Sequence, residues 1–511
     1  MRYTSQLIGK HVFITKCSDE KNSRLNGIKG LIEIKEYNGN NILYKHGKLK
    51  ISPDNMHLEY QDGTPFFWLG DTWWKALTAR CKWPEVFKTV TKDRVDKGFT
   101  VVQIAVGLGP EVPYPGFDKD FELFENNEGG YCWFKNFTSI NPLYFDFADV
   151  KMKHLVENGI VPCIFGPWGY YLQLLGIEKI KKHWRYLISR WGSYPVIWCA
   201  AGEIRMHYYD YLTGDPVKKE EIKAELTRGW SEVIRYIKEK DPFKNLITAH
   251  PSPGDESYAT SDIFNDPGLF DIDMLQTGHS DFNSFDRTFK TLNKSLRNIP
   301  KKPVIDAEPC YENIMGGSLH NTQRFLFWTH MLSGTAGHSY GTDGIWTFRS
   351  EENYMGKVGR WSTETWNEAM KHPGSYQIGL GKKFLEKYEW HKFKPHPEWV
   401  IPHSDDSNFY LPYCAGIDGQ VRMIYIPATY LQKRILDFTD ITITSIEKNS
   451  NYTAFFFDPR KGTIIDKQIV KPDNDGKWSP QKYGFFSWPS MEDWVLVLEN
   501  MPTSLQQNQN F

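Results

Sequence analysis

The feature that most constrains the fold is an alternation of apolar, β-rich segments with helical segments between about residues 48 and 345. The segments with the character of buried strands are Phe66–Gly70, Thr100–Val106, Ile160–Gly166, Val196–Ala201, Asn245–His250, Asp273–Gly278, Pro303–Glu308 and Thr335–Tyr340. The segments with helical periodicity are Pro84–Lys97, Tyr144–Asn158, Ile177–Arg190, Lys218–Lys240, Asn283–Arg297 and Thr322–Leu332. Gly98 and Gly159 follow two of these helices, as is common at helix C-termini. The pattern predicts a (β/α)8 barrel. An open, doubly wound sheet is the alternative, but no Gly-x-Gly-x-x-Gly motif follows the first strand.

The residue composition and pattern of the sequence change on both sides of this region. Residues 1–47 are polar and rich in Lys and Asn, and we expect a few strands packed on a larger body. The barrel is expected to occupy residues 48–375. In residues 376–501 short strand-like segments alternate with Gly, Pro, Asn and Asp, which predicts a small antiparallel β-sandwich. Residues 502–511, with several Gln and Asn, are expected to form a disordered tail.

Charge and cysteine usage exclude several classes of function. The chain has 61 basic and 62 acidic residues among 511, so nucleic acid or an anionic membrane is not an expected partner. No apolar run of 18 residues predicts a membrane span. The seven cysteines form no Cys-x-x-Cys pair, and we expect neither a bound metal nor a cofactor. Residues 1–6 begin no apolar signal segment, so we expect a cytoplasmic protein, or a secreted or periplasmic one if a leader has been removed.

Two carboxylate motifs follow strand-like segments. Ala200-Ala201-Gly202-Glu203 ends the fourth predicted strand, and Asp306-Ala307-Glu308-Pro309 ends the seventh. Functional groups of such barrels lie at the C-terminal ends of the strands, so Glu203 and Glu308 are expected on one rim. Glycoside hydrolysis needs at least two carboxyl groups that face each other, one as proton donor and one as nucleophile or base. Because side chains alternate along a strand, we expect Asp306 on the same side as Glu308.

Polar and aromatic residues follow the other predicted strands. On one rim they would form a sugar pocket, with hydrogen-bonding groups for hydroxyls and rings for stacking. The residues assigned to this pocket are Asp71, Trp73, Gln103, Trp168, His250, Gln276, His279, Asp306, Glu312, His338, Tyr340 and Trp346. His250, His279 and His338 could instead approach one another as metal ligands, but no tight His/Asp spacing supports a metal.

Several motifs resemble those of the apiosidase-like glycoside hydrolases. They are Phe66-Phe67-Trp68-Leu69-Gly70-Asp71-Thr72, Gly98-Phe99-Thr100-Val101-Val102-Gln103, Gln276-Thr277-Gly278-His279, Pro303-Val304-Ile305-Asp306-Ala307-Glu308-Pro309 and Ser333-Gly334-Thr335-Ala336-Gly337-His338-Ser339-Tyr340-Gly341. The resemblance covers roughly residues 48–500. It implies a (β/α)8 barrel, often followed by a β-sandwich known as a collagen-binding domain; Phe457–Gly462 and Asp493–Glu499 resemble that module.

The resemblance also implies roles for the two carboxylates. Glu203 matches the catalytic carboxylate after the fourth strand, and Glu308 matches the nucleophile after the seventh. The sequence departs from the family at the first position, where relatives commonly show Gly-Gly-Asp and this chain has Ala201-Gly202-Glu203. A Glu side chain reaches one methylene further than Asp, so we expect the accepted sugar to differ.

The sequence therefore predicts a glycosidase, retaining and exo-acting, that cleaves a terminal sugar from a plant- or algal-type oligosaccharide or glycan. The alternatives are a non-catalytic carbohydrate-binding protein on a barrel scaffold and an adhesion protein that acts through its C-terminal sandwich. Metal-dependent hydrolysis is a third. The sequence leaves the oligomeric state open.

Overall fold

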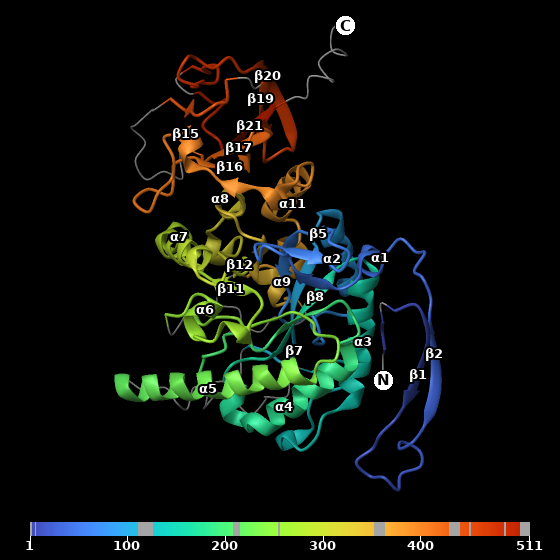
Figure 1. Ribbon diagram of the computed structural model, residues 1–511. Coiled ribbons are helices and arrows are strands. Elements are labelled where there is room, and N and C mark those ends of the chain that lie inside the picture. Colours follow the sequence, from blue (N-terminus) through green and yellow to red (C-terminus); the bar gives the residue numbers. More distant parts are fainter. Residues whose placement is uncertain are drawn as a thin grey trace.

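The computed structural model describes residues 3–5, 7–110, 126–207, 215–253, 256–351, 363–428, 440–448, 451–484 and 487–500. Its centre is an eight-stranded parallel sheet in the order β10-β9-β8-β7-β6-β13-β12-β11 (Figure 1). The strands are β6 (Trp68–Thr72), β7 (Val101–Leu108), β8 (Val161–Pro167), β9 (Ile197–Cys199), β10 (Ile247–Thr248), β11 (Asp273–Gln276), β12 (Val304–Glu308) and β13 (Gly337–Tyr340). The Asp271 amide donates to the Ile247 carbonyl, and the Thr248 hydroxyl to the Ile272 carbonyl, so hydrogen bonds also join the two ends of the sheet. The predicted barrel is confirmed.

Helices alternate with these strands and cover the outside of the sheet. They are α2 (Glu85–Asp96), α3 (Pro142–Glu157), α4 (Tyr171–Trp191), α5 (Pro216–Lys240), α7 (Phe282–Arg297) and α8 (His320–Ser333). Asn141 and Asp215 cap α3 and α5 with their side chains, and each is followed by a proline that suits the first turn. Gly98 and Gly159 have positive φ after α2 and α3, which is the helix-ending role that the sequence indicated.

Near the C-terminus lies a separate antiparallel sheet of six strands in the order β14-β16-β17-β21-β19-β20. These strands are β14 (Lys394–Pro395), β16 (Tyr413–Ile417), β17 (Val421–Ile426), β19 (Tyr452–Asp458), β20 (Thr463–Ile469) and β21 (Trp494–Asn500). A pair formed by β15 (Val400–Ile401) and β18 (Thr442–Ile443) lies against it. Helix α11 (Pro373–Leu385) crosses the boundary that the sequence placed at residue 375.

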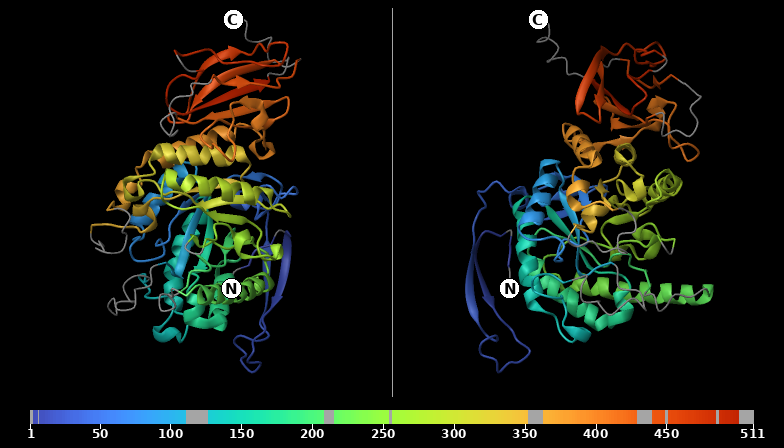
Figure 2. Two further views of the ribbon diagram at one scale, coloured as in Figure 1. Left: turned by 90° about the vertical axis from the view of Figure 1, so that its left-hand side faces the viewer. Right: turned by 180° about the vertical axis from the view of Figure 1, so that it is seen from behind.

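The central strands β17, β19 and β21 of this C-terminal sheet are buried on both faces, which explains their long apolar runs, whereas the edge strand β20 is largely exposed. Alternate residues Met423 and Tyr425 of β17 share a hydrophobic cluster with α8 and α11, whereas Ile424 and Ile426 pack toward β15 and β18. The ring of Phe384 on α11 stacks on Phe457 with centroids 3.9 Å apart. Figures 1 and 2 show α8 and α11 between this sheet and the barrel.

A fully buried ion pair crosses the same junction. Arg324 on α8 donates from Nε and Nη2 to the two carboxylate oxygens of Asp493 at 2.8 and 2.6 Å. Arg324 also donates to Gln377 on α11 at 2.6 Å. The barrel and the C-terminal sheet therefore share both apolar and ionic contacts.

The N-terminal residues form two small elements. An antiparallel hairpin of β1 (Gly9–Ile14) and β2 (Lys29–Ile34) stands apart from the barrel (Figure 2). After it come α1 (Ile42–His46) and a sheet of β3 (Leu49–Ile51), β4 (Leu58–Tyr60) and β5 (Pro65–Phe66).

The remaining short helices are α6 (Thr260–Ile263), α9 (Asp343–Trp346) and α10 (Trp366–Ala369). The expected tail, 502–511, lies outside the described residues. In the part of the chain that is described, no helix has the length and apolar character needed to cross a bilayer.

The substitution Arg324→Met tests the ion pair at this junction. It leaves the Asp493 carboxylate buried without its partner, and we expect a loss of about 3–5 kcal/mol in the free energy of unfolding. Chemical denaturation followed by tryptophan fluorescence measures this loss. Lys290→Met, which removes an exposed pair with Asp286, is the control and should change little. Equal stabilities of the two variants would contradict a structural role for the pair.

Candidate active site

Glu203 and Glu308 both lie on the C-terminal rim of the barrel. Glu308 is the last residue of β12, and Glu203 follows β9 by four residues. Glu308 is buried and Glu203 is half-buried. The negative charge of Glu308 raises the pKa of Glu203, so the two carboxylates are close enough to interact electrostatically. The structure thus brings together the two groups that the sequence singled out.

The conformation of the Glu203 loop depends on Gly202 and Trp168. A Cβ atom on Gly202 would lie 2.3 Å from the Trp168 ring, so only a glycine at position 202 leaves room for this ring. The next residue, Glu203, has a φ of 39°, a left-handed conformation that is uncommon for a residue with a side chain. Gln276 donates from Nε2 to Glu203 Oε1 at 3.2 Å. The predicted residues Trp168 and Gln276 therefore both contact this carboxylate or its loop.

Glu308 is held by two imidazoles from neighbouring strand ends. His279 Nε2 lies 2.9 Å from Oε1 of Glu308, and His250 Nε2 lies 3.3 Å from Oε2. The His250 contact is close but not aligned as a hydrogen bond. The Tyr311 amide donates to His279 Nδ1 at 3.4 Å, which leaves the proton of the neutral ring on Nε2, facing Glu308. His250 and His279 thus both lie beside Glu308, and their contact with a sugar stays a prediction.

The two carboxyl groups have pKa values displaced in opposite directions. Burial raises the pKa of Glu203, and the negative charge of Glu308 raises it further, against hydrogen bonds from Gln276 and Trp168. Burial alone would also raise the pKa of Glu308, but His250 and His279 outweigh it and lower this pKa to about 2. A carboxyl with a raised pKa beside one with a lowered pKa is the arrangement that acid–base chemistry at a glycosidic bond uses.

A bulge in β12 separates Asp306 from Glu308. Along the β11–β12 ladder Leu275 pairs with Asp306 and the next residue, Gln276, pairs with Glu308, so Ala307 has no partner. The extra residue turns the two carboxylates to opposite sides of the sheet. Buried Gln103 fixes the bulge by donating from Nε2 to the Ala307 carbonyl at 2.8 Å. The expectation that Asp306 and Glu308 share a side was therefore wrong.

Asp306 instead belongs to a buried polar cluster between the sheet and α8. The Thr277 hydroxyl donates to Asp306 Oδ2 at 2.8 Å, and His330 Nε2 lies 4.0 Å from the same oxygen. His330 and His338 approach each other with their Nδ1 atoms 3.1 Å apart. Burial raises the pKa of Asp306 to about 7 and lowers that of His330 to about 3. Asp306 and His338, both assigned to the sugar pocket, thus lie behind the catalytic rim.

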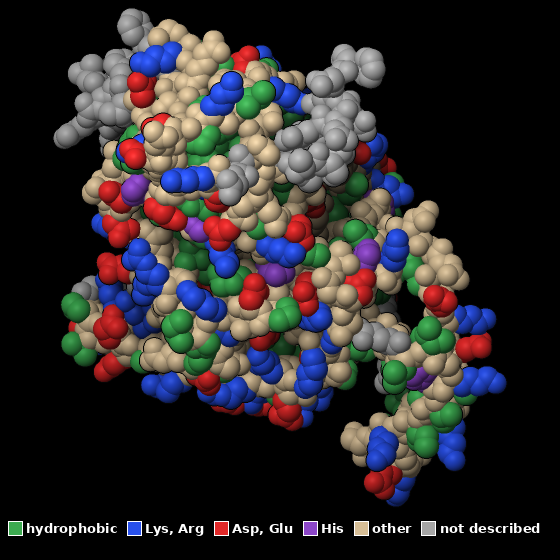
Figure 3. Space-filling view, turned by 45° about the horizontal axis from the view of Figure 1, so that its top comes forward, with side chains coloured by type: hydrophobic (Ala, Val, Ile, Leu, Met, Phe, Trp, Pro, Cys, Tyr) green, Lys and Arg blue, Asp and Glu red, His purple; other side chains and the backbone are tan. Residues whose placement is uncertain are grey.

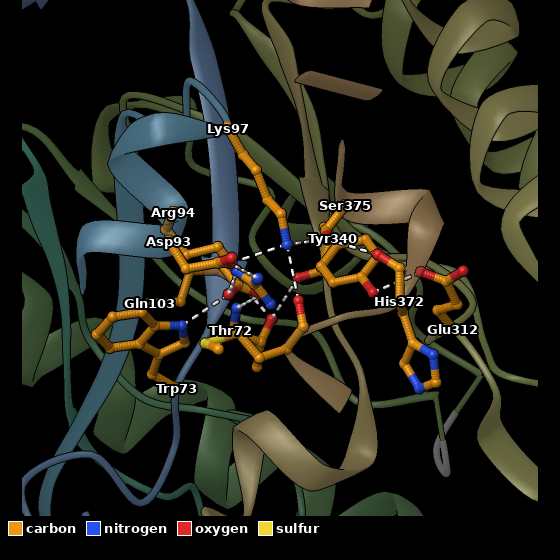
Figure 4. Close-up of polar contacts among 12 residues, drawn as sticks. Thr72, Trp73, Asp93, Arg94, Lys97, Gln103, Glu312, Tyr340, His372 and Ser375 are labelled. Carbon is orange, nitrogen blue, oxygen red and sulfur yellow. Dashed lines mark hydrogen bonds and ion pairs between the residues drawn. The ribbon is translucent and has the colours of Figure 1, made fainter. Parts of the chain in front are cut away.

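Asp71 and Trp73 lie on the side of β6 that faces α2, and Figure 4 shows Trp73 next to Arg94 of that helix. Asp71 is fully buried and accepts from Arg94 Nε of α2 at 2.6 Å and from Trp73 Nε1 at 2.7 Å. The Trp73 ring packs edge-on against Phe87 and Phe348. The sequence placed Asp71 and Trp73 in the pocket, whereas the structure uses them to attach α2 to the sheet.

Tyr340 and Glu312 join the same outer network. The Tyr340 hydroxyl donates to Glu312 Oε2 at 2.6 Å (Figure 4). Glu312 Oε1 accepts from the Gly374 amide at 3.0 Å. Glu312 therefore places a carboxylate at the N-terminus of α11, where the helix dipole favours it. Tyr340 and Glu312 therefore also lie outside the predicted pocket. Trp346 lies in α9 beyond β13, and its carbonyl accepts from the Lys75 amide at 3.0 Å.

Two aromatic residues at the site were not assigned from the sequence. The Trp74 ring lies 5.3 Å from that of Trp168 and 6.0 Å from that of His250. The Tyr311 ring lies 4.3 Å from that of His279, and its side chain interacts with Glu308. Strand alternation could have indicated Trp74, because Thr72 faces the barrel interior and Trp74 shares its parity. Within the described residues, no group of three or more His, Cys, Asp or Glu has the arrangement of a metal site.

The substitution Asp306→Asn tests the buried carboxyl behind the rim. Its folded pKa of about 7 exceeds the usual 3.8, so its stabilising contribution is complete below pH 3.8 and is lost as pH rises through 7. Asparagine does not titrate. Between pH 4 and 8, we expect the free energy of unfolding to fall by about 1–4 kcal/mol less in the variant than in wild type.

Urea denaturation at several pH values measures this slope. Asp286→Asn, at an exposed surface pair, is the control and should follow the wild-type curve. Parallel curves for wild type and Asp306→Asn would show that the carboxyl titrates normally in the folded protein.

Comparisons with known proteins agree with this geometry. Residues 52–392 match the family model described as the apiosidase-like catalytic domain. A glycoside hydrolase family 5 structure from Bacteroides vulgatus superposes with a TM-score of 0.69 at 20% identity, covering 91% of this chain and 98% of that one. A structure described as a glycoside hydrolase gives a TM-score of 0.68 at 20% identity, covering 90% and 98%. A search of curated protein sequences finds no match. The family model covers most of the chain, and we conclude that this protein is a glycosidase that belongs to the apiosidase-like family.

Proposed function

We propose that this glycosidase is retaining, with Glu203 as acid and base and Glu308 as nucleophile. The observation that carries the division of roles is the contact of His279 and His250 with Glu308 at 2.9 and 3.3 Å, which lowers the pKa of Glu308 while the pKa of Glu203 is raised. With its pKa lowered to about 2, Glu308 has the negative charge needed to attack an anomeric carbon. Glu203 keeps its proton to a higher pH than an ordinary Glu, which suits proton donation to a glycosidic oxygen.

The proposed reaction has two steps. In the first, a Glu308 oxygen forms a bond to the anomeric carbon while Glu203 gives its proton to the departing oxygen of the aglycone. In the second, the Glu203 carboxylate takes a proton from water, and the water oxygen displaces Glu308 from the same carbon. The sugar leaves with its original anomeric configuration, and both carboxyl groups return to their starting states.

We further propose that the substrate is a terminal sugar of a plant- or algal-type glycan. Support comes from the family model, which is described as an apiosidase-like catalytic domain. The rings of Trp74 and Trp168 beside the carboxylates suit stacking on the apolar face of a sugar. The adhesion alternative is less favoured, because the C-terminal sheet packs one face on α8 and α11 and the other on β15 and β18.

The substitutions Glu203→Gln and Glu308→Gln separate the two roles. We expect Glu203→Gln to lower kcat/KM about 10²–10⁴-fold on oligosaccharides, whose leaving groups need protonation, but far less on dinitrophenyl glycosides. Glu308→Gln should abolish turnover of both substrates. Glu312→Gln is the control, because that carboxylate caps α11 on the outer side of the barrel.

Proton NMR of the first product formed then tests the stereochemistry. Retention of the anomeric configuration supports the proposal, whereas inversion would assign Glu308 as a general base. Equal losses on both substrates in Glu203→Gln would remove that residue from the acid role.

The dependence of kcat/KM on pH tests the assigned protonation states. For wild type we expect an alkaline limb where Glu203 loses its proton, above the usual Glu value of 4.5, and no acid limb down to about pH 4. His279→Asn removes the hydrogen bond at 2.9 Å that stabilises ionised Glu308. The pKa of Glu308 should rise, and an acid limb should enter the measurable range. An unchanged acid side in His279→Asn would contradict the role given to this imidazole.

A further inference from the structure

Gln276 lies between the two carboxylates of the site. It is the last residue of β11, and in the parallel ladder with β12 its partner is Glu308. Its side-chain nitrogen Nε2 donates to Glu203 Oε1 at 3.2 Å. Residues that are partners in a parallel ladder project their side chains to the same face of the sheet. The Gln276 side chain therefore borders Glu308 as well as Glu203.

The side-chain carbonyl oxygen of Gln276 has no partner. Gln276 is 3% exposed, and its Oε1 forms no hydrogen bond within the part of the chain that the structure describes. Glu203 fixes the orientation of the amide, because a carboxylate oxygen accepts and must face the donor nitrogen. Oε1 is thereby directed away from Glu203. A buried acceptor without a partner is unfavourable and rare in native structures, so a partner for Oε1 is expected from a ligand.

Other buried polar atoms around Glu308 share this feature. Glu308 Oε2, the Tyr311 hydroxyl and His250 Nε2 are also buried and make no hydrogen bond among the described residues. With Gln276 Oε1 they form a set that includes both acceptors and donors. A sugar suits such a set, because each of its hydroxyl groups can donate one hydrogen bond and accept others.

The chemistry of the anomeric carbon decides which sugar oxygen can pair with Gln276. Besides the glycosidic oxygen, the two oxygens nearest to this carbon are the ring oxygen and the C2 hydroxyl. The ring oxygen carries no proton and cannot donate to Oε1. The C2 hydroxyl can donate, and hydrogen bonds to this hydroxyl strengthen in the transition state of glycoside hydrolysis. An acceptor beside Glu308 is therefore matched by the C2 hydroxyl.

We propose that Gln276 Oε1 accepts a hydrogen bond from the C2 hydroxyl of the terminal sugar and so selects glycans in which this hydroxyl is free. The proposal rests on the proposed function, which places the anomeric carbon at Glu308. Sugars without a hydroxyl at C2, and sugars whose C2 oxygen carries a substituent, lack the proton that Oε1 needs. Charge offers no comparable selection on the face drawn in Figure 3, where acidic and basic side chains are interspersed.

A comparison of two substrates in two enzymes tests the proposal. The value of kcat/KM is measured for wild type and Gln276→Met on the dinitrophenyl glycoside used for Glu203→Gln and on its 2-deoxy counterpart. This leaving group needs no proton from Glu203, so loss of the contact with Glu203 affects both substrates alike. We expect Gln276→Met to lower kcat/KM about 10–100-fold on the parent glycoside and less than about threefold on the 2-deoxy glycoside. Equal factors would show that Gln276 only positions Glu203 and would overturn the proposal.

Gln103→Met is the matched control. Gln103 is also buried with an unpartnered Oε1, but its Nε2 donates to the Ala307 carbonyl at 2.8 Å and supports the bulge of β12. Any loss of kcat/KM in this variant should therefore be the same on both substrates. A loss confined to the parent glycoside in Gln103→Met, and absent from Gln276→Met, would assign the contact to Gln103 and overturn the proposal.

Wild type alone gives a second measurement that does not depend on the folding of a variant. The ratio of kcat/KM to the rate constant of spontaneous hydrolysis should be about 10–100-fold lower for the 2-deoxy glycoside, and equal ratios would overturn the proposal. The stereochemistry of the product separates this proposal from the proposed mechanism. Inversion would assign Glu308 as a general base, but C2 would remain next to the reacting carbon and the comparison of substrates would still test Gln276.

Discussion

The chemistry of this site depends on the contacts of His250 and His279 with the Glu308 carboxylate. A buried carboxylate without such partners would take up a proton, because burial penalises its charged form. The two imidazoles come from the ends of the fifth and sixth barrel strands and keep Glu308 ionised. The retained negative charge in turn helps Glu203 hold its proton. The difference in pKa between the two carboxyl groups therefore depends on these two histidines.

The sequence predicted the fold and the inner part of the site, but not the outer polar layer. Strand positions, Glu203, Glu308, Trp168, His250, Gln276 and His279 follow from apolar segments and the residues that end them. Asp71, Asp306, His338 and Tyr340 were misplaced because the orientation of each side chain depends on strand parity. Parity alone is not enough for Asp306, since the bulge at Ala307 reverses it, and no residue in that motif marks a bulge.

The misplaced residues share a structural task. Asp71 holds α2 through Arg94, Glu312 holds α11 through the Gly374 amide, and Asp306 faces α8. Asp71 and Glu312 thus attach outer helices to the barrel, and Asp306 lies on the side of β12 that faces α8. Their burial makes the relative position of strand and helix costly to change, since an unpaired buried carboxylate is strongly destabilising. These contacts on the outer side of the barrel thereby fix the position of the rim.

The two oxygens of Glu308 are not equivalent, and this difference bears on catalysis. Oε1 accepts a hydrogen bond from His279 at 2.9 Å, whereas Oε2 lies 3.3 Å from His250 without an aligned hydrogen bond. A nucleophilic oxygen must use a lone pair to form the new bond, so an oxygen without a directed donor is the better nucleophile. In the proposed mechanism Oε2 is therefore the atom that attacks, while His279 holds Oε1 and fixes the plane of the carboxylate. His250 faces Oε2 from a neighbouring strand end at 3.3 Å, where it can stabilise the negative charge of that oxygen.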